Sequence, residues 1–212
     1  MVKRFGLRPC LPGFEKINRF HDKESGRIMV KLLPGEFYVC REPEVMVTVL
    51  GSCISACLMD LRNGIAGMNH FMLPGQKYEE TDVLSRSARY GSWAMEVLLN
   101  EMLKAGAVRE NIQAKIFGGG RVISSLEYIE IGRQNTEFVV HYLSLEHVPI
   151  IAQDTGDIFP RKLQFFSDSG RVRVRKLEML RNDTVVEREQ RYRRQLQQQQ
   201  DTTSVELFGE EE

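Results

Sequence analysis

The sequence predicts an α/β (α+β) fold: a single-domain layered sandwich with a mixed, mostly antiparallel sheet and two main helices. Its 212 residues, 42% of them hydrophobic, are ordinary for one medium-sized globular domain. Short runs rich in β-branched residues outnumber helical patterns, and hairpin-type turn residues separate several neighbouring runs. Because hairpins join antiparallel neighbours, the sheet is expected to be mostly antiparallel.

The first 40 residues are expected to form an N-terminal arm or edge of the fold. Three prolines interrupt their apolar pieces, and Ser25-Gly26 and Pro34-Gly35 are turn signals. Two short strands are predicted beside these turns, over Ile28–Leu32 and Phe37–Cys40.

Stronger strand patterns begin at Val45 and form the predicted core of the sheet. Val45–Leu50 is rich in β-branched residues, Ile54–Met59 follows a Gly-Ser turn, and Ile65–Leu73 follows Asn63-Gly64. Further strands are predicted over Gln113–Phe117, Ile150–Ala152, Leu163–Phe166 and Arg171–Lys176, the last two joined by Asp168-Ser169-Gly170.

Two amphipathic helices are predicted between these strands. The first begins with Asp82 as its N-cap and ends near Gly106, and apolar residues recur through it at steps of three and four. Its apolar stripe is expected to lie on the sheet. The second helix runs from about Arg133 to His147, before Pro149.

Residues 181–212 are predicted to be a polar, disordered tail that is partly helical at most. They hold five arginines against eight acidic residues, and glutamines crowd positions 195–200. The chain is therefore divided into an arm (1–40), a folded domain (41–180) and the tail (181–212). Since the whole chain has a formal charge of zero, the first 180 residues are mildly basic.

Charge and hydropathy exclude several classes of protein. The 29 Lys and Arg residues balance the 29 Asp and Glu residues, whereas proteins held mainly by nucleic acid or an anionic membrane need a positive excess. The longest uncharged stretch, Val45–Met59, is too short to span a membrane, and the N-terminus lacks the apolar region of a secretory signal. We therefore expect a cytoplasmic protein with reduced cysteines, no nucleic-acid partner and no membrane insertion.

The candidate nucleophile is Cys53, in the segment TVLGSC at residues 48–53. A strand of bulky residues there meets Gly51 and Ser52, which would let a substrate approach the backbone and leave N–H groups free for an oxyanion. The alternative is that Cys53 is only a small buried hydrophobic residue, as single cysteines usually are. Composition alone does not decide between the two.

The position of histidine provides a test, because a nucleophilic thiol needs a base within hydrogen-bond reach. If His70 pairs back across a four-residue loop, Leu61–Gly64, it faces Ser55 and is the diagonal neighbour of Cys53, about 7–8 Å away between Cβ atoms. A two-residue turn would place it opposite Cys57. Cys57 is therefore a rival nucleophile, although burial in the middle of a strand would raise its pKa. No metal site is expected, because no second pair of residues with zinc-ligand spacing accompanies these cysteines.

Six segments in a fixed order resemble the chemoreceptor glutamine deamidase family, CheD. LGSC, followed seventeen positions later by the histidine of HFMLP, is the most specific pair. The match spans roughly residues 40 to 177, and its segments are TVLGSC (48–53), GMNHFMLP (67–74), KIFGGG (115–120), IGRQN (131–135), DTG (154–156) and GRVRVRKL (170–177).

This resemblance implies a Cys-His-Thr hydrolase with a fold similar to the catalytic domain of bacterial cytotoxic necrotizing factor toxins. By position it puts the nucleophile on Cys53, the histidine on His70 and the threonine on Thr48, and it favours Cys53 over Cys57. It implies that glutamines of methyl-accepting chemotaxis receptors are converted to glutamate without a cofactor. It also suggests hydrolysis of receptor glutamyl methyl esters and a CheC-type phosphatase as a second partner.

Two functions of different classes fit these observations. The first is an enzyme that deamidates receptor glutamines with Cys53 and His70. The second is a non-catalytic chemotaxis adaptor that uses the same groove to hold a receptor or phosphatase helix. A cysteine amidase acting on small substrates is a weaker third interpretation.

Three further features have structural interpretations. Gly118–Gly120 lacks the spacing and the lysine of a phosphate loop, so a turn passing close to the active site is predicted. Arg171, Arg173 and Arg175 alternate with valines and should share one solvated sheet face, with docking onto acidic receptor helices as the functional alternative. Asn135 is predicted to cap the second helix rather than to bind substrate.

Overall fold

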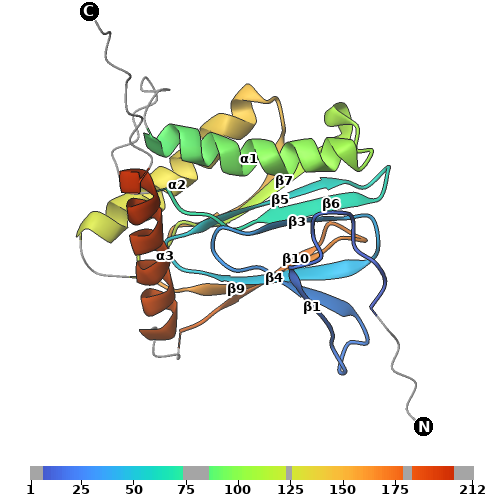
Figure 1. The fold of residues 1–212 in the computed structure, drawn as a ribbon, viewed down its shortest axis with the longest axis horizontal. Helices are drawn as coiled ribbons and strands as arrows, with labels where there is room; N and C mark the ends of the chain where they lie inside the picture. Colours follow the sequence, from blue (N-terminus) through green and yellow to red (C-terminus); the bar gives the residue numbers. More distant parts are fainter. Residues whose placement is uncertain (1–6, 74–85, 123–125, 179–182, 203–212) are drawn as a thin grey trace, which may run out of the picture.

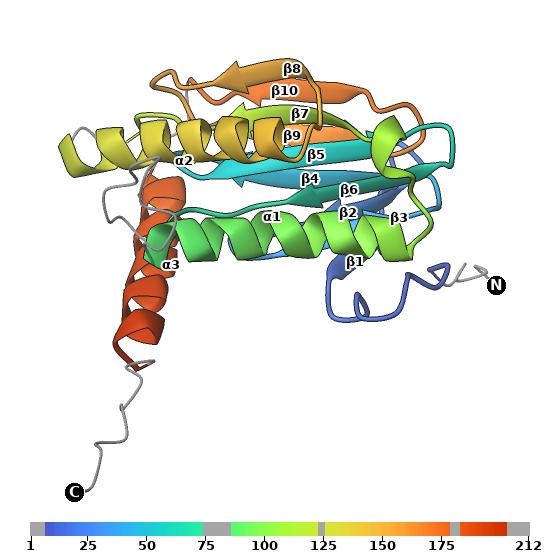
Figure 2. The ribbon, with the colours of Figure 1, turned by 90° about the horizontal axis from the view of Figure 1, so that it is seen from above.

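The computed structural model of the chain describes residues 7–73, 86–122, 126–178 and 183–202 (Figure 1). Two five-stranded sheets are stacked, and helices α1 (Arg86–Lys104) and α2 (Leu126–Leu145) cover the outer face of the second sheet (Figures 1 and 2). A third helix, α3 (Asp183–Thr202), stands at one end of the sandwich. None of the described helices is long and apolar enough to cross a membrane. The predicted layered α/β fold is confirmed.

The first sheet has the strand order β1-β2-β4-β9-β10. Its strands are β1 (Asn18–His21), β2 (Ile28–Lys31), β4 (Glu44–Leu50), β9 (Arg161–Phe166) and β10 (Val172–Lys176). Among the pairs of neighbouring strands in this sheet, only β2 and β4 are parallel, and the other pairs are antiparallel. Side chains alternate along β4, so Met46, Thr48 and Leu50 face the core between the sheets while Val45 and Val47 lie on the outer face.

The second sheet has the strand order β3-β6-β5-β7-β8. Its strands are β3 (Phe37–Cys40), β5 (Ile54–Asp60), β6 (Ile65–Asn69), β7 (Gln113–Gly118) and β8 (Ile150–Thr155). Only β7 and β8 run parallel among its neighbouring pairs. Every residue of β5 is buried, because this strand lies between the helices and the first sheet. The prediction of a mixed, mostly antiparallel arrangement is confirmed.

The structure differs from the sequence prediction near both ends of the chain. Strand β1 is not predicted, because its Asn-Arg-Phe-His pattern is short and mostly exposed. Strand β2, placed in the predicted arm, lies inside the first sheet between β1 and β4. The predicted cap of the first helix, Asp82, lies outside the described residues.

The segment predicted to be a disordered tail contains helix α3. Most of its residues are polar, which is why its composition indicates no packed core. Nevertheless Glu189, Arg193 and Leu196 are buried, and their spacing of four and then three residues places them on one helix face. Helix α3 therefore packs on the end of the sandwich.

Candidate active site

The candidate site lies where the chain crosses from one sheet to the other. Strand β4 ends at Leu50 and β5 begins at Ile54, so residues 51–53 form the connection, called here the Gly51–Cys53 loop. A Cβ on Gly51 would lie 2.7 Å from Glu189 Oε1 and 2.8 Å from Val122 Cγ2, so a side chain at the first position of the loop would have to displace them. Close packing explains the small residue at the end of a bulky strand.

All three carbonyl groups of this loop are held by hydrogen bonds. Gly120 and Gly119 donate their N–H groups to its first and third carbonyls, both at 2.7 Å, and Asn135 Nδ2 donates to the second at 2.8 Å. The C=O and N–H of one peptide point in opposite directions. The bonds to the first and second carbonyls therefore fix the direction of the N–H groups of Ser52 and Cys53.

The glycine turn after β7 passes close to the Gly51–Cys53 loop, as predicted. A Cβ on Gly118, which has a φ of +116°, would lie 2.2 Å from the carbonyl oxygen of Cys53. The turn is held from its other side by residues 154–156. Gly156 donates its N–H to the Gly118 carbonyl at 2.9 Å, and the buried guanidinium of Arg161 donates to Asp154 Oδ1 at 2.7 Å.

Asn135 does not cap helix α2, and that prediction is wrong. Helix α2 begins at Leu126 rather than near Arg133, so Asn135 lies in its middle. Its side chain is fully buried, and besides its bond to the Ser52 carbonyl it accepts the N–H of Leu73 at 2.8 Å through Oδ1. Asn135 thus ties the Gly51–Cys53 loop to the segment that follows β6.

The register between β5 and β6 determines which cysteine lies near the histidine. These strands pair across the predicted four-residue loop, and beyond them Ile54 and Phe71 exchange both backbone hydrogen bonds, at 2.9 and 3.0 Å. This register makes His70 the diagonal neighbour of Cys53 on the same sheet face, at about 7–8 Å between Cβ atoms. Cys57 pairs with a methionine of β6, so the alternative register is wrong.

Hydrogen bonding assigns the tautomer of His70. Thr48 Oγ1 lies 2.9 Å from the carbonyl oxygen of Leu32 and 2.7 Å from Nδ1 of His70. A hydroxyl has one proton, so when Thr48 donates it to Leu32 it accepts the Nδ1–H of His70. The lone pair of the neutral ring is then on Nε2, which is buried and has no hydrogen-bond partner among the described residues.

A carboxylate of helix α3 occupies the point where the N–H groups of the loop converge. Glu189 Oε1 accepts the N–H groups of Gly51 at 2.9 Å and Cys53 at 3.2 Å. Its Oε2 accepts the N–H of Ser52 at 3.0 Å and the Ser52 hydroxyl at 2.7 Å. Sequence analysis missed Glu189 because it lies in the predicted tail. The i, i+3, i+7 spacing of Glu189, Tyr192 and Leu196 is the signal that could have found it.

Comparison with known proteins identifies the family. The family model described as CheD chemotactic sensory transduction matches residues 72–176. A protein of Janthinobacterium sp. (strain Marseille) is 47% identical over 192 residues, which cover 91% of this chain and 95% of that protein. The chain belongs to the CheD family. A protein of Halorhodospira halophila, also 47% identical, covers 94% of this CheD-family chain and aligns over 93% of its own length. Both relatives are named "Probable chemoreceptor glutamine deamidase CheD".

The segments that resemble CheD meet at this site, although they are far apart in the sequence. TVLGSC supplies Thr48 and the Gly51–Cys53 loop, and GMNHFMLP supplies His70. KIFGGG and IGRQN hold the carbonyl groups of the loop, and DTG supports the glycine turn. One constellation therefore accounts for five of the six CheD segments.

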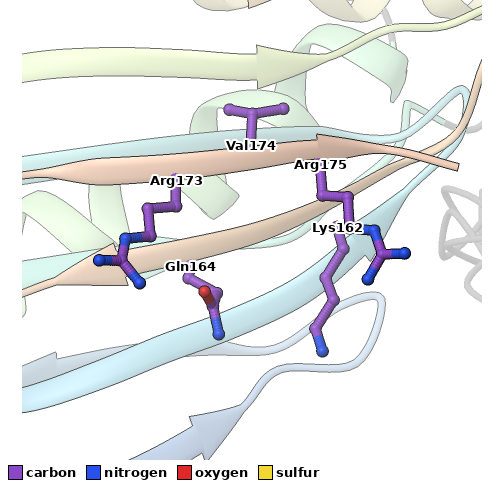
Figure 3. A pocket seen from close by; sticks show the side chains of 5 residues that line it. All are labelled: Lys162, Gln164, Arg173, Val174 and Arg175. Carbon is purple, nitrogen blue, oxygen red and sulfur yellow. The ribbon is translucent and has the colours of Figure 1, made fainter.

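The sixth segment, GRVRVRKL, contains β10, the edge strand of the first sheet, and lies apart from the Gly51–Cys53 loop. Arg173 and Arg175 project from β10 to the same side as Lys162 and Gln164 of β9, whereas Val174 points the other way (Figure 3). The predicted sharing of one face is confirmed for these two arginines. The guanidinium groups of Arg171 and Arg173 also lie 4.8 and 5.2 Å from the ring centroid of Phe166, within the range of cation–π attraction. Docking of an acidic partner on this face stays a prediction.

Burial keeps both Cys53 and His70 neutral in this CheD-family structure. It lowers the pKa of His70 to about 3, and Arg188 contributes in the same direction. The pKa of Cys53 is raised well above its usual value, first by burial and then by the Glu189 carboxylate. The structure therefore holds a thiol and a neutral imidazole rather than a thiolate–imidazolium pair.

The shifted pKa of His70 makes stability depend on pH in a definite direction. An unfolded histidine titrates near 6.5, so between that pH and about 3 the unfolded chain binds the proton first and stability falls as pH falls. Relative to its His70→Gln variant, the wild type should lose roughly 2.5 kcal/mol more unfolding free energy between pH 7.5 and 4.5. Urea denaturation of both proteins at both pH values measures the difference. Equal pH dependence would show that His70 is not held neutral.

Proposed function

We propose that this protein is a chemoreceptor glutamine deamidase, which converts specific glutamines of methyl-accepting chemotaxis receptors to glutamate and thereby tunes adaptation. The supporting observation is the buried Thr48–His70 pair: His70 is the diagonal neighbour of Cys53, and its Nε2 has no hydrogen-bond partner among the described residues. The convergent N–H groups of the Gly51–Cys53 loop add a site for an oxyanion. The substrate class follows from the names of the relatives.

The first half-reaction forms a thioester. His70 Nε2 takes the proton of Cys53, and the thiolate attacks the carbonyl carbon of the glutamine side chain. The resulting oxyanion accepts hydrogen bonds from the N–H groups of Gly51, Ser52 and Cys53. When the tetrahedral intermediate collapses, the C–N bond breaks, and the imidazolium returns its proton to the departing nitrogen, which leaves as ammonia.

The second half-reaction releases glutamate. His70 takes a proton from water, the hydroxide attacks the thioester carbon, and the C–S bond breaks as the thiol regains its proton. Thr48 positions the imidazole by accepting its Nδ1–H, which keeps the lone pair on Nε2. The same steps release methanol instead of ammonia from a receptor glutamyl methyl ester.

A non-catalytic adaptor is the second candidate function. Helix α3 already lies on the Gly51–Cys53 loop, so this surface accommodates a helix. A helix of a receptor or of a CheC-type phosphatase could be held there without any reaction. The two functions differ in whether bound receptor is chemically changed.

Deamidation of a purified receptor cytoplasmic fragment tests the proposal. We expect mass spectrometry to show conversion of specific receptor glutamines to glutamate, with one ammonia released for each. The assay should include the Glu189→Ala variant, so that an occupied site does not hide activity. If the wild type and the Glu189→Ala variant both bind the receptor but release no ammonia, the result would instead support the adaptor. Turnover of free glutamine would support an amidase of small substrates. Methanol release from methylated receptor tests the esterase reaction.

A further inference from the structure

We propose that helix α3 is a built-in competitor of the substrate and that Glu189 occupies the active site as a tethered analogue of the glutamate product. This inference rests on the proposed deamidase function. It concerns how access to the site is regulated, which neither the catalytic residues nor the relatives' names address.

Glu189 has the chemical identity of the reaction product. Its side chain is the one that deamidation of a glutamine would create, and it is 2% exposed. Its two oxygens accept three backbone N–H groups and one hydroxyl from the Gly51–Cys53 loop. A buried carboxylate needs such partners to offset the loss of hydration. The loop is therefore a carboxylate-binding site whose ligand comes from the chain itself.

Helix α3 also contacts the segments that support both proposed catalytic residues. Glu189 lies on the loop that contains Cys53. One turn later, Tyr192 packs on Gly35, because a Cβ added to Gly35 would lie 3.0 Å from Tyr192 Cε2. The Tyr192 hydroxyl is also hydrogen-bonded to the hydroxyl of Tyr90 in α1. Gly35 in turn donates its N–H to the His70 carbonyl at 2.7 Å. The helix thus stands across the ends of β4 and β5, over the site (Figure 1).

The docked helix also has an electrostatic effect on Cys53 and His70. Cys53 is completely buried, and the negative charge of Glu189 adds to the rise in its pKa. Arg188, also on α3, adds to the lowering of the His70 pKa. A docked α3 therefore blocks access to the thiol and disfavours the thiolate–imidazolium pair that attack requires. Release of the helix should make Cys53 both accessible and more acidic.

Competition by a tethered helix has a kinetic consequence. Since α3 competes for the same N–H groups as the substrate, its release should lower KM for the receptor more than it changes kcat. The exposed Glu187, two residues before Glu189, provides a matched control on the same helix. Its replacement removes the same charge from α3 but no contact with the Gly51–Cys53 loop.

Alkylation of Cys53 tests the inference without any receptor. In the full-length chain, Glu189→Ala and Tyr192→Ala should each raise the rate at which iodoacetamide modifies Cys53 by about tenfold or more, whereas Glu187→Ala should not. Peptide mass spectrometry follows each cysteine separately, and the fully buried Cys57 reports unfolding of the domain. An unchanged Cys53 rate in both variants would overturn the proposal, and so would an equal gain at Cys57. Neither result depends on whether the receptor is deamidated.

The Glu189→Gln variant tests the product analogy. This variant places a glutamine side chain where the carboxylate of Glu189 lies. The protein should therefore deamidate its own residue 189 and convert the glutamine to glutamate. The conversion should be absent when Cys53→Ala is added. Mass spectrometry of the α3 peptide distinguishes the amide from the acid. If the amide persists in a chain that still deamidates the receptor, α3 does not hold its side chain in a product-like position and the analogy is wrong.

Discussion

Replacement of Cys53 by alanine is expected to lower receptor deamidation by at least about 10³-fold, whereas Cys57→Ala should leave it nearly unchanged. Of the two cysteines, only Cys53 lies in the Gly51–Cys53 loop, beside the convergent N–H groups and diagonal to His70. Cys57 lies in the middle of β5, where it pairs with Met68 of β6 rather than lying diagonal to His70. The proposed thioester forms on the thiol of Cys53, so its removal should stop the reaction.

The two variants are closely matched, which makes the comparison decisive. Both cysteines are completely buried in or beside the same strand, so each alanine removes one sulfur atom from a packed environment. Initial rates of receptor deamidation by mass spectrometry, with urea denaturation to confirm similar stability, measure the difference. Full activity in Cys53→Ala, or a matching loss in Cys57→Ala, would contradict the assignment of the nucleophile.

The register between β5 and β6 could be narrowed from the sequence to two alternatives, because it depends on local rules. The apolar runs on either side of Leu61–Gly64 fix two strands, and a four-residue loop between them fixes which residues are opposite. The period of two then determines that His70 and Cys53 share a face. Spacing alone left a two-residue turn open, and the observed pairing of Asp60 with Ile65 removes it.

Asn135, whose role was predicted wrongly, and Glu189, which was not predicted, act through contacts between distant segments. Asn135 binds residues that precede it by 83 and 62 positions, and Glu189 binds the Gly51–Cys53 loop from more than 130 positions away. The contacts of Asn135 leave no periodic pattern near it, and those of Glu189 leave only the narrow stripe that it forms with Tyr192 and Leu196. A helix that buries only one narrow stripe of side chains needs few apolar residues. The sequence around Glu189 is therefore mostly polar, and a polar composition predicts disorder.

Replacement of Asn135 by alanine is expected to lower kcat by about 10²-fold and the free energy of unfolding by about 2–4 kcal/mol. The Ser52 carbonyl and the Leu73 N–H would both lose their hydrogen-bond partner. Asn135 is completely buried, so bulk water does not reach this position to replace the lost bonds. The peptide between Ser52 and Cys53 would then be free to rotate. Because its N–H is one of the proposed oxyanion donors, this change should affect the transition state more than receptor binding.

Steady-state kinetics and urea denaturation separate these two effects of Asn135→Ala. Asn111→Ala is the control, since Asn111 lies in a short 3-10 helix, Arg109–Asn111, whose residues are not buried. A fall in kcat with little change in KM, measured where the variant is folded, would show that Asn135 positions the loop. If stability falls but kcat does not, the bonds from Gly119 and Gly120 suffice to orient the N–H groups, and Asn135 serves only the fold.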